Sequence, residues 1–540
     1  MRGVSGKRWV ILSENIEPPG HLIEKFGRVV AQILTNRNFE NYVDLIFNVK
    51  LKNILPYKLL PNIEEGAFRI KRAIEKGERI VIFGDYDVDG ITATAILYDF
   101  LKRIKARVVP VIPSRNMGYG LNQEMVRLFS RYADLVITVD NGTSSANEIR
   151  SMGIDVVVID HHNPPSSLPE AIVINPKISE DTPAELKEIS SAALSFYMVA
   201  SLRALMDVDI DIRNYIDMVA IGTVADVMPL NYLNRIFVIK GVELLNSVIE
   251  GKVNKPGIKA LLDSSGIEKV SFRDISFSIA PKLNSAGRIG DPKLSLNLLI
   301  EKSYERARFY ARKLEILNIS RKKLSENILK EAYELLDTTK NFLCVSSSRW
   351  HTGVLGIVAG RIAREFSKPC GIFKECGDKV TGSVRSVEGI DIHYLFSGIK
   401  DMFLKWGGHS FALGVTIPSK RFGEFRERVE NLLENYRKSM GVLEVDMELD
   451  PKHITGDISE KILALQPFGE GNSVPTFKTQ ISKYNVERVS KNRYKIKMDS
   501  IEFNCFNIKL IEALRGEPKK VVYSFDGEGY EIIDVEAGNL

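Results

Sequence analysis

Short apolar runs alternate with amphipathic segments through residues 79–176. The run RIVIFGD is rich in β-branched residues, and the segment ITATAILYDFLKRI after it has apolar positions at helical spacing. The order returns as RVVPVIP and LNQEMVRLFSRY, then DLVITVDNG and SSANEIRSMG, then IDVVVIDHH and AIVINP. Strands alternating with helices predict βα units and a parallel sheet. The continuous hydrophobicity of the strands fits a sheet covered on both faces.

The pattern changes along the rest of the chain and predicts further domains. Residues 185–265 are mostly helical in pattern, and the apolar positions between Glu301 and Leu336 step by three and four residues, which predicts one long amphipathic helix. A second α/β segment opens at NFLCVSSSRWHTGVLGIVAGRIAREF. After residue 445, about five short runs alternate at period two and predict a small antiparallel β-barrel. We expect five parts: a helical segment 1–75, an α/β domain 76–300, a connecting helix 301–336, a second α/β domain 337–442 and a barrel 443–540.

Composition is that of a globular protein with apolar cores. The 540 residues are 44% hydrophobic and 26% charged, and a prior of roughly 150 residues per domain gives three or four domains. A net charge of +5 permits a polyanionic partner without requiring one. The four cysteines show no paired metal spacing, and we interpret them as reduced thiols. With no apolar signal core and no run near about 18 apolar residues, we expect a cytoplasmic protein without a membrane span.

Acids and histidines follow several strands of the predicted parallel sheet, where ligands of such sheets bind. They stand in FGDYDVDG, VITVDNG and VVVIDHH, and another acid stands in the apolar stretch VAIGTVADVMPL, where a carboxylate is costly unless it is paired or metal-bound. If DYDVD stays extended, alternation sends its three acids to one side. The residues that we expect to converge are Asp85, Asp87, Asp89, Asp140, Asp160, His161, His162 and Asp226.

Such a set of carboxylates would repel strongly in a low-dielectric cleft unless cations neutralised it. Many oxygens with one or two imidazoles suit Mn²⁺ or Mg²⁺ better than zinc. Two ions about 3.5–4 Å apart, sharing a bridging aspartate, activate a water and hold the leaving oxygen of a phosphoryl transfer. One aspartate after a strand is more often a turn former or helix cap, and one histidine is more often structural, but the whole set favours metal. A dinucleotide site is poorly supported, because no G-x-G-x-x-G follows the first strand.

The motifs GDYDVDGITA, VDNGTS, IDHHNPP and GTVADVMPL, in this order, resemble the DHH phosphoesterase superfamily. The segments SRWHTGVLGIVAGRIAREFSKPCGIF and WGGHSFALG resemble its accessory DHHA1 domain, and the C-terminal barrel resembles its OB-fold. The segments SFSIAPKLNSAGRIGDP and LQPFGEGNSVPTF are similar to those of members that degrade single-stranded DNA. The resemblance covers about residues 75–540 and implies an α/β fold with a parallel-sheet DHH domain, a connecting helix, a DHHA1 domain and an OB-fold.

The resemblance also implies a metal-dependent, single-stranded-DNA-specific 5′→3′ exonuclease that releases 5′-mononucleotides in DNA repair and recombination. Two Mn²⁺ or Mg²⁺ ions would serve as cofactors, with Asp140 as the bridge. The implied metal ligands are Asp85, Asp87, Asp89, Asp140, His161 and Asp226. The implied catalytic set is Asp140, His161, His162 and Asp160, in which His162 contacts the scissile phosphate and Asp160 orients a histidine.

By the same resemblance, Arg115, Ser383 and Arg385 would bind the 5′-terminal phosphate of a free DNA end, since guanidinium groups match phosphate oxygens. Arg288 would lie near the entry for single strands, and His409 would add a phosphate contact. Any one of the arginines taken alone is more often a surface or ion-pair residue. In the barrel, charges and rings interleave at Tyr484, Arg488, Arg493, Tyr494, Lys495 and Lys497, which fits nucleic-acid stacking or an ordinary strand face equally well.

One departure from the family pattern lies at ISSAALSF, residues 189–196, where relatives have a Cys-Gly-Ala-Gly-like turn. We expect it to affect only local packing or substrate fit. Two other functions remain open: smaller relatives hydrolyse short oligonucleotides, cyclic dinucleotides or pyrophosphate, and some relatives have lost metal ligands and serve as scaffolds. The APKLNSAGR segment, the barrel and the filled ligand positions favour the exonuclease. The family also suggests single-strand-binding protein and a RecQ-type helicase as partners.

Overall fold

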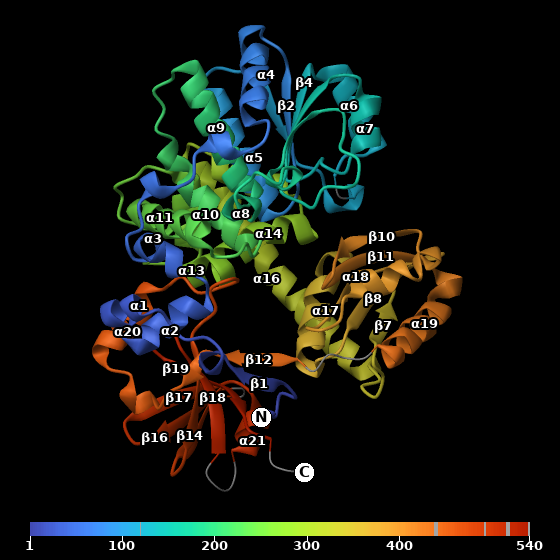
Figure 1. Ribbon diagram of the computed structural model, residues 1–540. Helices are drawn as coiled ribbons and strands as arrows, with labels where there is room; N and C mark the ends of the chain where they lie inside the picture. The colour runs from blue at the N-terminus through green and yellow to red at the C-terminus, as the bar shows by residue number, and fades with distance from the viewer. Residues whose placement is uncertain (119, 437–440, 491–492, 515–518, 538–540) are drawn as a thin grey trace. The chain divides into compact units, whose positions relative to one another are not determined.

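The computed structural model describes residues 1–118, 120–436, 441–490, 493–514 and 519–537. The chain forms two compact units (Figure 1). One consists of Asp44–Arg321 with Gly469–Asn472, and the other consists of Met1–Val43, Lys322–Phe468 and Ser473–Leu540. Within the described ranges, no helix combines the length and apolarity needed to span a bilayer.

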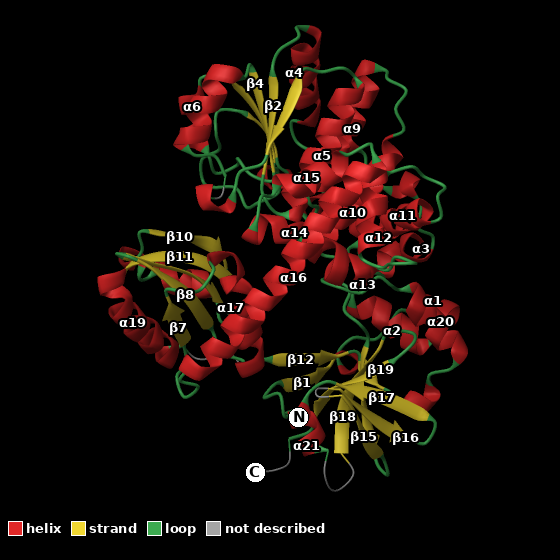
Figure 2. Ribbon diagram, turned by 180° about the vertical axis from the view of Figure 1, so that it is seen from behind, coloured by secondary structure: helices red, strands yellow, loops and turns green. Residues whose placement is uncertain are grey.

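A five-stranded parallel sheet organises the first unit, in the order β3-β2-β4-β5-β6. Its strands are β2 (Ile80–Gly84), β3 (Val108–Val111), β4 (Leu135–Val139), β5 (Asp155–Ile159) and β6 (Ile172–Ile174). Helices α6 (Gln123–Tyr132) and α7 (Ala146–Met152) cover one face, while α4 (Ile63–Glu75), α5 (Val88–Arg103) and α9 (Ser191–Met206) cover the other (Figures 1 and 2). The predicted parallel sheet is confirmed, and its strands β2 and β4 are buried along their whole length, which explains their continuous apolar sequence.

Helices fill the rest of this unit. They are α3 (Val43–Phe47), α8 (Ala184–Lys187), α10 (Ile216–Ala225), α11 (Tyr232–Ile249), α12 (Pro256–Ser264), α13 (Phe272–Asp274), α14 (Ala280–Ile289) and α15 (Lys293–Ile300). A short π-helical stretch, Ile275–Ile279, leads into α14. Helix α10 packs against α5, α9 and α11 and is buried along its length, which explains why its sequence has no polar face. The long helix α16 (Tyr304–Leu335) falls within the predicted 301–336, and the boundary between the units lies inside it.

A mixed sheet with the order β10-β11-β9-β8-β7 lies in the second unit. Its strands are β7 (Leu343–Ser347), β8 (Cys370–Cys376), β9 (Lys379–Arg385), β10 (Lys405–His409) and β11 (Ala412–Pro418), with only the β7–β8 pair parallel among the described strands. The helices are α17 (Thr352–Phe366), α18 (Ile392–Ser397) and α19 (Phe422–Asn435). An aromatic core that includes Phe373, Phe396 and Phe425 packs between sheet and helices.

The C-terminal strands form a seven-stranded sheet, β13-β14-β18-β19-β17-β16-β15. They are β13 (Met447–Glu448), β14 (Thr476–Ile481), β15 (Asn485–Ser490), β16 (Arg493–Met498), β17 (Ile501–Cys505), β18 (Lys519–Phe525) and β19 (Tyr530–Val535), with α21 (Ile508–Ala513) after β17. Neighbours pair antiparallel except β13 with β14 and β17 with β19. The runs that alternate at period two correspond to strands β14, β16, β17, β18 and β19.

The N-terminal segment, expected to be helical over residues 1–75, contains helices α1 to α4 and also one short strand. Strand β1 (Arg8–Ile11) pairs in parallel with β12 (Val442–Val445), and Trp9 donates from its indole to buried Asp534 at 2.9 Å. Helices α1 (Gly20–Phe26) and α2 (Arg28–Asn36) follow, and α2 packs against α20 (Gly456–Ala464). The short strand was not expected, because its partner β12 is remote in sequence.

Candidate metal centre

Three strands of the parallel sheet end in register, and an aspartate follows each. Gly84 at the end of β2 pairs with Val139 of β4, which pairs with Ile159 of β5. The next residues are Asp85, Asp140 and Asp160. Three acids therefore lie next to one another at the carboxyl edge of the sheet, directly after neighbouring strands.

Asp140 leaves its strand in an unusual backbone conformation. Its φ is 63°, in the left-handed region that non-glycine residues rarely adopt, and its N–H donates to Ile159 O at 3.0 Å. Such a conformation costs of order 1–3 kcal/mol and persists where the surroundings fix it. The turn allows the Asp140 carboxylate to face the acids of neighbouring elements.

The segment DYDVD does not stay extended, so the condition for alternation of its acids is not met. Strand β2 ends at Gly84 and α5 begins at Val88, with Asp87 as the N-cap that accepts from Gly90 N at 3.1 Å. A Cβ on Gly90 would lie 2.7 Å from backbone atoms of Asp85, so only glycine lets the first helical turn approach the strand end this closely. The acids converge through a strand-to-helix turn, because the helix begins before the third acid.

The acids and histidines form three overlapping groups whose ligand atoms lie within 4.8 Å of one another (the groups are Asp85, Asp87 and Asp140; Asp89, His161 and Asp226; and Asp140, His161 and His162). Asp140 and His161 each belong to two groups. The structure thus brings together seven of the eight residues expected at the strand ends, and it connects them through Asp140 and His161.

His161 lies among three carboxylates. Its Nε2 is 3.4 Å from Asp140 Oδ1, 3.4 Å from Asp226 Oδ2 and 3.9 Å from Asp89 Oδ2. Asp226 follows the last residue of α10, and Val227 after it has a φ of 55°, so the helix ends sharply at this acid. Two strands and two helices, β4, β5, α5 and α10, therefore contribute to one cluster.

Asp89 is held by the N-terminus of α9. Its Oδ2 accepts from Ser191 N at 2.7 Å and its Oδ1 accepts from Ala192 N at 2.9 Å. These N–H groups belong to the first turn of the helix, where they have no intrahelical acceptor, and the helix dipole favours a negative charge there. Both oxygens of this fully buried carboxylate are oriented by the backbone.

Burial and mutual repulsion dominate the electrostatics of the cluster. Burial first, and then the charge of Asp87, raises the pKa of Asp85 to about 8 and that of Asp89 to about 7. Burial, followed by the charges of Asp89 and Asp87, raises the pKa of Asp226 to about 8. The pKa of Asp140 lies well above its ordinary range, because Asp140 is buried and faces four other aspartates. These acids ionise together at neutral pH only if positive charge is supplied.

The donor set fits divalent cations such as Mn²⁺ or Mg²⁺. It is rich in carboxylate oxygens with one or two imidazoles, the combination that hard divalent ions prefer over zinc. Asp85 Oδ1 is buried and, among the described residues, has no hydrogen-bond partner. A buried carboxylate oxygen in that state is suited to a metal, since an unsatisfied charged oxygen is costly.

Asp160 contacts His162 and the backbone of nearby residues. Its Oδ1 lies 2.7 Å from His162 Nδ1 and accepts from the N–H of His161 at 2.9 Å, while its Oδ2 accepts from Thr143 N at 3.1 Å. Burial alone would raise the pKa of Asp160, but the hydrogen bonds from His162 and Thr143 lower it. Conversely, although burial opposes it, the Asp160 contact raises the pKa of His162. Asp160 and His162 form a hydrogen-bonded pair, which connects Asp160 to the cluster through His162.

Two arginines lie next to the acids in the same unit. Arg115 donates from Nε to Gly287 O at 3.0 Å, and its guanidinium lies 4.5 Å from the ring centroid of Tyr86. Arg288 follows Gly287 in α14, and its charge acts on Tyr86 together with that of Arg115. A Cβ on Gly287 would lie 2.4 Å from Tyr86 O, so glycine allows α14 to contact the loop between β2 and α5. The structure brings Arg115 and Arg288 together around Tyr86.

The remaining expected residues belong to the other unit. Arg385 Nη1 donates to Ser383 Oγ at 2.6 Å, and both side chains project from β9. Ala412 on β11 is the register partner of Arg385 and also of His409 on β10, so Arg385 and His409 lie in one row across three strands. Ser383 and Arg385 are in contact, and exposed His409 lies at the same end of that sheet.

In the C-terminal sheet, three of the interleaved residues line one pocket of about 490 Å³: Tyr484, Arg488 and Tyr494. Lys495 pairs with Glu502 at 2.7 Å and Lys497 with Glu487 at 2.9 Å. The aromatic residues therefore gather, while these two lysines are engaged on the strand surface.

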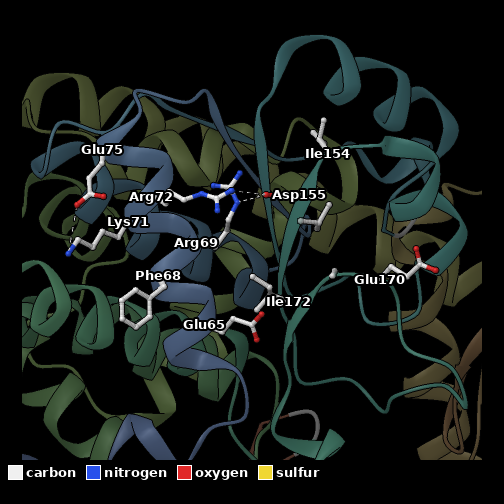
Figure 3. A pocket seen from close by; sticks show the side chains of 12 residues that line it. Glu65, Phe68, Arg69, Lys71, Arg72, Glu75, Ile154, Asp155, Glu170 and Ile172 are labelled. Atoms are coloured by element: carbon white, nitrogen blue, oxygen red, sulfur yellow. Dashed lines mark hydrogen bonds and ion pairs between the residues drawn. The ribbon is translucent and has the colours of Figure 1, made fainter.

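A larger pocket, of about 820 Å³, lies where β5 and β6 begin, at the edge of the parallel sheet opposite the acids (Figure 3). Ion pairs cross its lining, such as Arg69 with Asp155 at 2.5 Å and Lys71 with Glu75 at 3.8 Å. None of the described residues that line it is an expected site residue. It is not the candidate metal centre.

Two contributors to the site were missed by sequence reasoning. Ser191 donates from Oγ to Asp140 Oδ1 at 3.0 Å, although the segment ISSAALSF was expected to affect only packing or substrate fit. Tyr86, within the DYDVD motif, contacts Arg115. The serine pair before an apolar helical run is a helix-start signal, but the neighbour of that helix start is set by tertiary structure.

Comparison with known proteins yields three family models in order along the chain: "DHH family, N-terminal domain" over residues 79–223, "DHHA1 domain" over 339–435 and "RecJ OB domain" over 445–528. Among curated proteins, the single-stranded-DNA-specific exonuclease RecJ of Dickeya dadantii is 33% identical over 485 residues, covering 84% of this chain and 83% of that protein. RecJ of Escherichia coli is 31% identical with the same coverage.

Solved structures agree. The crystal structure of RecJ in complex with Mn²⁺ from Thermus thermophilus matches with a TM-score of 0.85 at 25% identity, covering 99% of this chain and 80% of that chain. A crystal structure of exonuclease RecJ bound to manganese matches with a TM-score of 0.63 at 30% identity, covering 71% of this chain and 96% of that one. With three family domains in order and close relatives matched over most of their length, this chain belongs to the RecJ family of DHH proteins.

Proposed function

We propose that this chain is a metal-dependent exonuclease that degrades single-stranded DNA from a free 5′ end and releases 5′-mononucleotides in DNA repair and recombination. The observation that carries the proposal is the buried cluster of acids around Asp140 and His161, whose raised pKa values call for cations. The curated relatives are single-stranded-DNA-specific exonucleases, and two related structures hold manganese.

The proposed ligands of two Mn²⁺ or Mg²⁺ ions are Asp85, Asp87, Asp89, Asp140, His161 and Asp226. When bound, such ions neutralise the acids, lower the pKa of a water and stabilise charge on the phosphate. The chain's own contribution is orientation: the N-terminus of α9 fixes both oxygens of Asp89, and the left-handed turn at Asp140 directs its carboxylate inward.

His162 and Asp160 are proposed to act on the scissile phosphate as a unit. With Nδ1 bonded to Asp160, Nε2 is the ring nitrogen that would donate to a phosphate oxygen. The raised pKa of His162 favours the imidazolium, which makes that hydrogen bond charge-assisted. Asp160 keeps the ring oriented and its positive charge compensated.

Arg115, Arg288, Ser383, Arg385 and His409 are proposed to bind DNA phosphates. Arg115 and Arg288 lie around Tyr86, next to the acidic cluster. On β9, the guanidinium of Arg385 donates to the hydroxyl of Ser383. A fork of guanidinium donors with a hydroxyl suits the terminal oxygens of a 5′-phosphate, which would give the enzyme its polarity.

The functional parts are proposed to follow the expected domains. The catalytic domain would be residues 76–300, the DHHA1 domain 337–442 would bind phosphates, and the OB domain 443–540 would hold the single strand through its aromatic pocket. Single-strand-binding protein and a RecQ-type helicase are proposed partners, since the substrate must be unwound and single-stranded. A cytoplasmic location is proposed because the substrate is cellular DNA.

Digestion of one oligonucleotide labelled at its 5′ or its 3′ end, with Mn²⁺, tests the proposal. The 5′ label should appear at once as a mononucleotide, while the 3′ label should pass through progressively shorter fragments. A blunt duplex should resist. Asp140→Ala should abolish cleavage and keep DNA binding, measured by fluorescence anisotropy.

Three results would overturn the proposal. Immediate release of the 3′ label would reverse the polarity. Faster hydrolysis of dinucleotides than of long strands would assign the chain to the smaller-substrate class. Complete inertness with both Mn²⁺ and Mg²⁺, despite DNA binding, would point to a scaffold.

A further inference from the structure

Ser191, the first residue of α9, contacts two acids of the cluster through two different groups. Its backbone N–H donates to Asp89 Oδ2 at 2.7 Å, and its hydroxyl donates to Asp140 Oδ1 at 3.0 Å. Ser191 is fully buried, and Asp140 is 2% exposed. These two acids come from different elements, α5 and the end of β4, so one residue of α9 connects them.

The two contacts depend on the sequence in different ways. Any residue at position 191 except proline supplies the N–H to Asp89, because helix geometry positions it. Only a side-chain donor supplies the bond to Asp140. The hydroxyl therefore adds a function to a helix start that would hold Asp89 without it.

The oxygen that Ser191 contacts also faces the histidines. Asp140 Oδ1 lies 3.4 Å from His161 Nε2 and 4.0 Å from His162 Nδ1. An ionised carboxylate oxygen has two lone-pair directions, so Oδ1 can accept from the hydroxyl and still serve as a ligand. The hydroxyl restricts rotation of the Asp140 carboxylate, whose backbone is already fixed by the left-handed turn.

We propose that Ser191 is a positioning residue, which holds the Asp140 carboxylate in the orientation that binds a divalent cation. The proposal rests on the metal-dependent function proposed above and deepens it, because it names a residue outside the ligand set that sets metal affinity. Removing an outer partner of a metal ligand typically weakens metal binding roughly 10–100-fold. Ser191→Ala should therefore bind Mn²⁺ at least about 10-fold more weakly than the parent chain.

Ser195, one turn further along α9, provides a matched control. It is also fully buried, but its hydroxyl has no hydrogen-bond partner among the described residues. Ser195→Ala removes the same atom from the same helix without touching the acids. It should bind Mn²⁺ like the parent.

The experiment is calorimetric titration of Mn²⁺ into the metal-free full chain, for the parent, Ser191→Ala, Ser191→Gly and Ser195→Ala. Both changes at Ser191 remove the hydroxyl and keep the N–H, so a failure of one variant to fold leaves the other. The melting temperature without metal, and the Mn²⁺ concentration that gives half-maximal DNA cleavage, are measured on the same samples. For the Ser191 variants, the half-maximal Mn²⁺ concentration should rise at least about 10-fold while KM for DNA stays within about twofold.

The outcomes distinguish a failure of this inference from a failure of the proposed function. A parent chain that binds no Mn²⁺ would contradict the proposed function itself. A parent that binds Mn²⁺, with Ser191→Ala binding within twofold of it, would contradict only the role of Ser191. If Ser191→Ala and Ser195→Ala bound Mn²⁺ equally weakly, the effect would be one of general packing. The same would follow if weaker binding in Ser191→Ala came with a lower metal-free melting temperature and a higher KM for DNA. Either result would contradict the role of Ser191.

Discussion

Strand β4 has an aspartate at each end, and the protein treats the two in opposite ways. Asp134, before the strand, accepts from Arg79 N at 2.7 Å, Nε at 2.9 Å and Nη2 at 2.8 Å, and these hydrogen bonds lower its pKa. Asp140, after the strand, is buried among other acids, and burial with their charges raises its pKa. At one end the chain supplies the counter-charge, and at the other end it supplies more of the same charge.

The next strand repeats the contrast. Asp155 at the start of β5 lies 2.5 Å from Arg69 and 3.9 Å from Arg72 (Figure 3). At the other end, Asp160 pairs with His162, while His161 turns to the acids around Asp140. The acids at the starts of β4 and β5 pair with arginines of the chain, whereas the acids around Asp140 face one another and His161. Because of this difference we propose the carboxyl edge as the ligand site.

The largest predicted effect comes from neutralising the two ends of β4 in turn. Asp140→Asn should lower kcat by roughly 10³-fold or more, because several kcal/mol of metal-assisted stabilisation are lost. Asp134→Asn should leave kcat within about twofold, since Asp134 takes no part in the cluster. Single-turnover cleavage of a single-stranded oligonucleotide measures both. Equal losses for the two variants would mean that the ends of the strand do not differ in function.

Asp160→Asn should have the next largest effect. Asp160 lies at the carboxyl edge but is paired with a histidine, so it tests whether pairing there serves chemistry. The asparagine cannot compensate the charge of His162, and kcat should fall roughly 10–100-fold, while Mn²⁺ affinity stays near that of the parent. A pH–rate profile should show the basic limb shifted to lower pH, because the pKa of His162 falls without its partner. Loss of Mn²⁺ binding in this variant would instead make Asp160 a ligand.

Mn²⁺ should stabilise the folded chain only through the carboxyl edge. At a free concentration of 100 times Kd, a bound ion contributes about 2.7 kcal/mol, and the melting temperature should rise by roughly 5–10 °C. Asp140→Asn should remove most of this increment, and Asp155→Asn should keep it. Differential scanning fluorimetry with and without a chelator is sufficient. An undiminished increment in Asp140→Asn would place the stabilising ion elsewhere.

The metal-free protein should lose stability as pH rises between about 4 and about 8. The folded pKa values of Asp85 and Asp226 are about 8, above their ordinary values, so the folded state binds more protons than the unfolded state in this window. Urea unfolding at several pH values measures this dependence of the unfolding free energy on pH, and saturating Mn²⁺ should make the dependence weaker. The raised pKa values would be contradicted if the stability of the metal-free parent rose with pH over this range, and rose by more than that of metal-free Asp140→Asn.

The smallest effect should come from Asp155→Asn. Its side chain is 57% exposed, and an exposed ion pair contributes about 0.2–1 kcal/mol to the free energy of unfolding. The loss should shrink in 1 M salt, and DNA cleavage should be unchanged. A large loss of cleavage would assign the amino-edge pocket a role in catalysis.

Much of the metal centre could be predicted from the sequence. Asp85, Asp140 and Asp160 each stand directly after a continuous apolar run, and parallel strands bring their carboxyl ends together, so their convergence follows from pattern alone. The grouping of Asp87 and Asp89 was expected for the wrong reason, because the start of α5 depends on the N-cap at Asp87 and the close approach of Gly90. The individual roles of these residues stay predictions.

Other features depend on contacts that no local pattern reveals. The hydroxyl of Ser191 reaches Asp140 because α9 begins against the end of the sheet, and a two-serine helix start is common in any helical protein. Strand β1 is a four-residue run whose partner, β12, is remote in sequence at Val442–Val445. In both cases tertiary placement gives the residue its role.

Anomalous diffraction at the manganese edge, from crystals of the full chain grown with Mn²⁺, tests the central claim most directly. The account predicts two manganese peaks roughly 3.5–4 Å apart at the carboxyl edge, with Asp140 contacting both. A map with no manganese there, and with these acids apart or paired to lysine or arginine as at the amino edge, would contradict it.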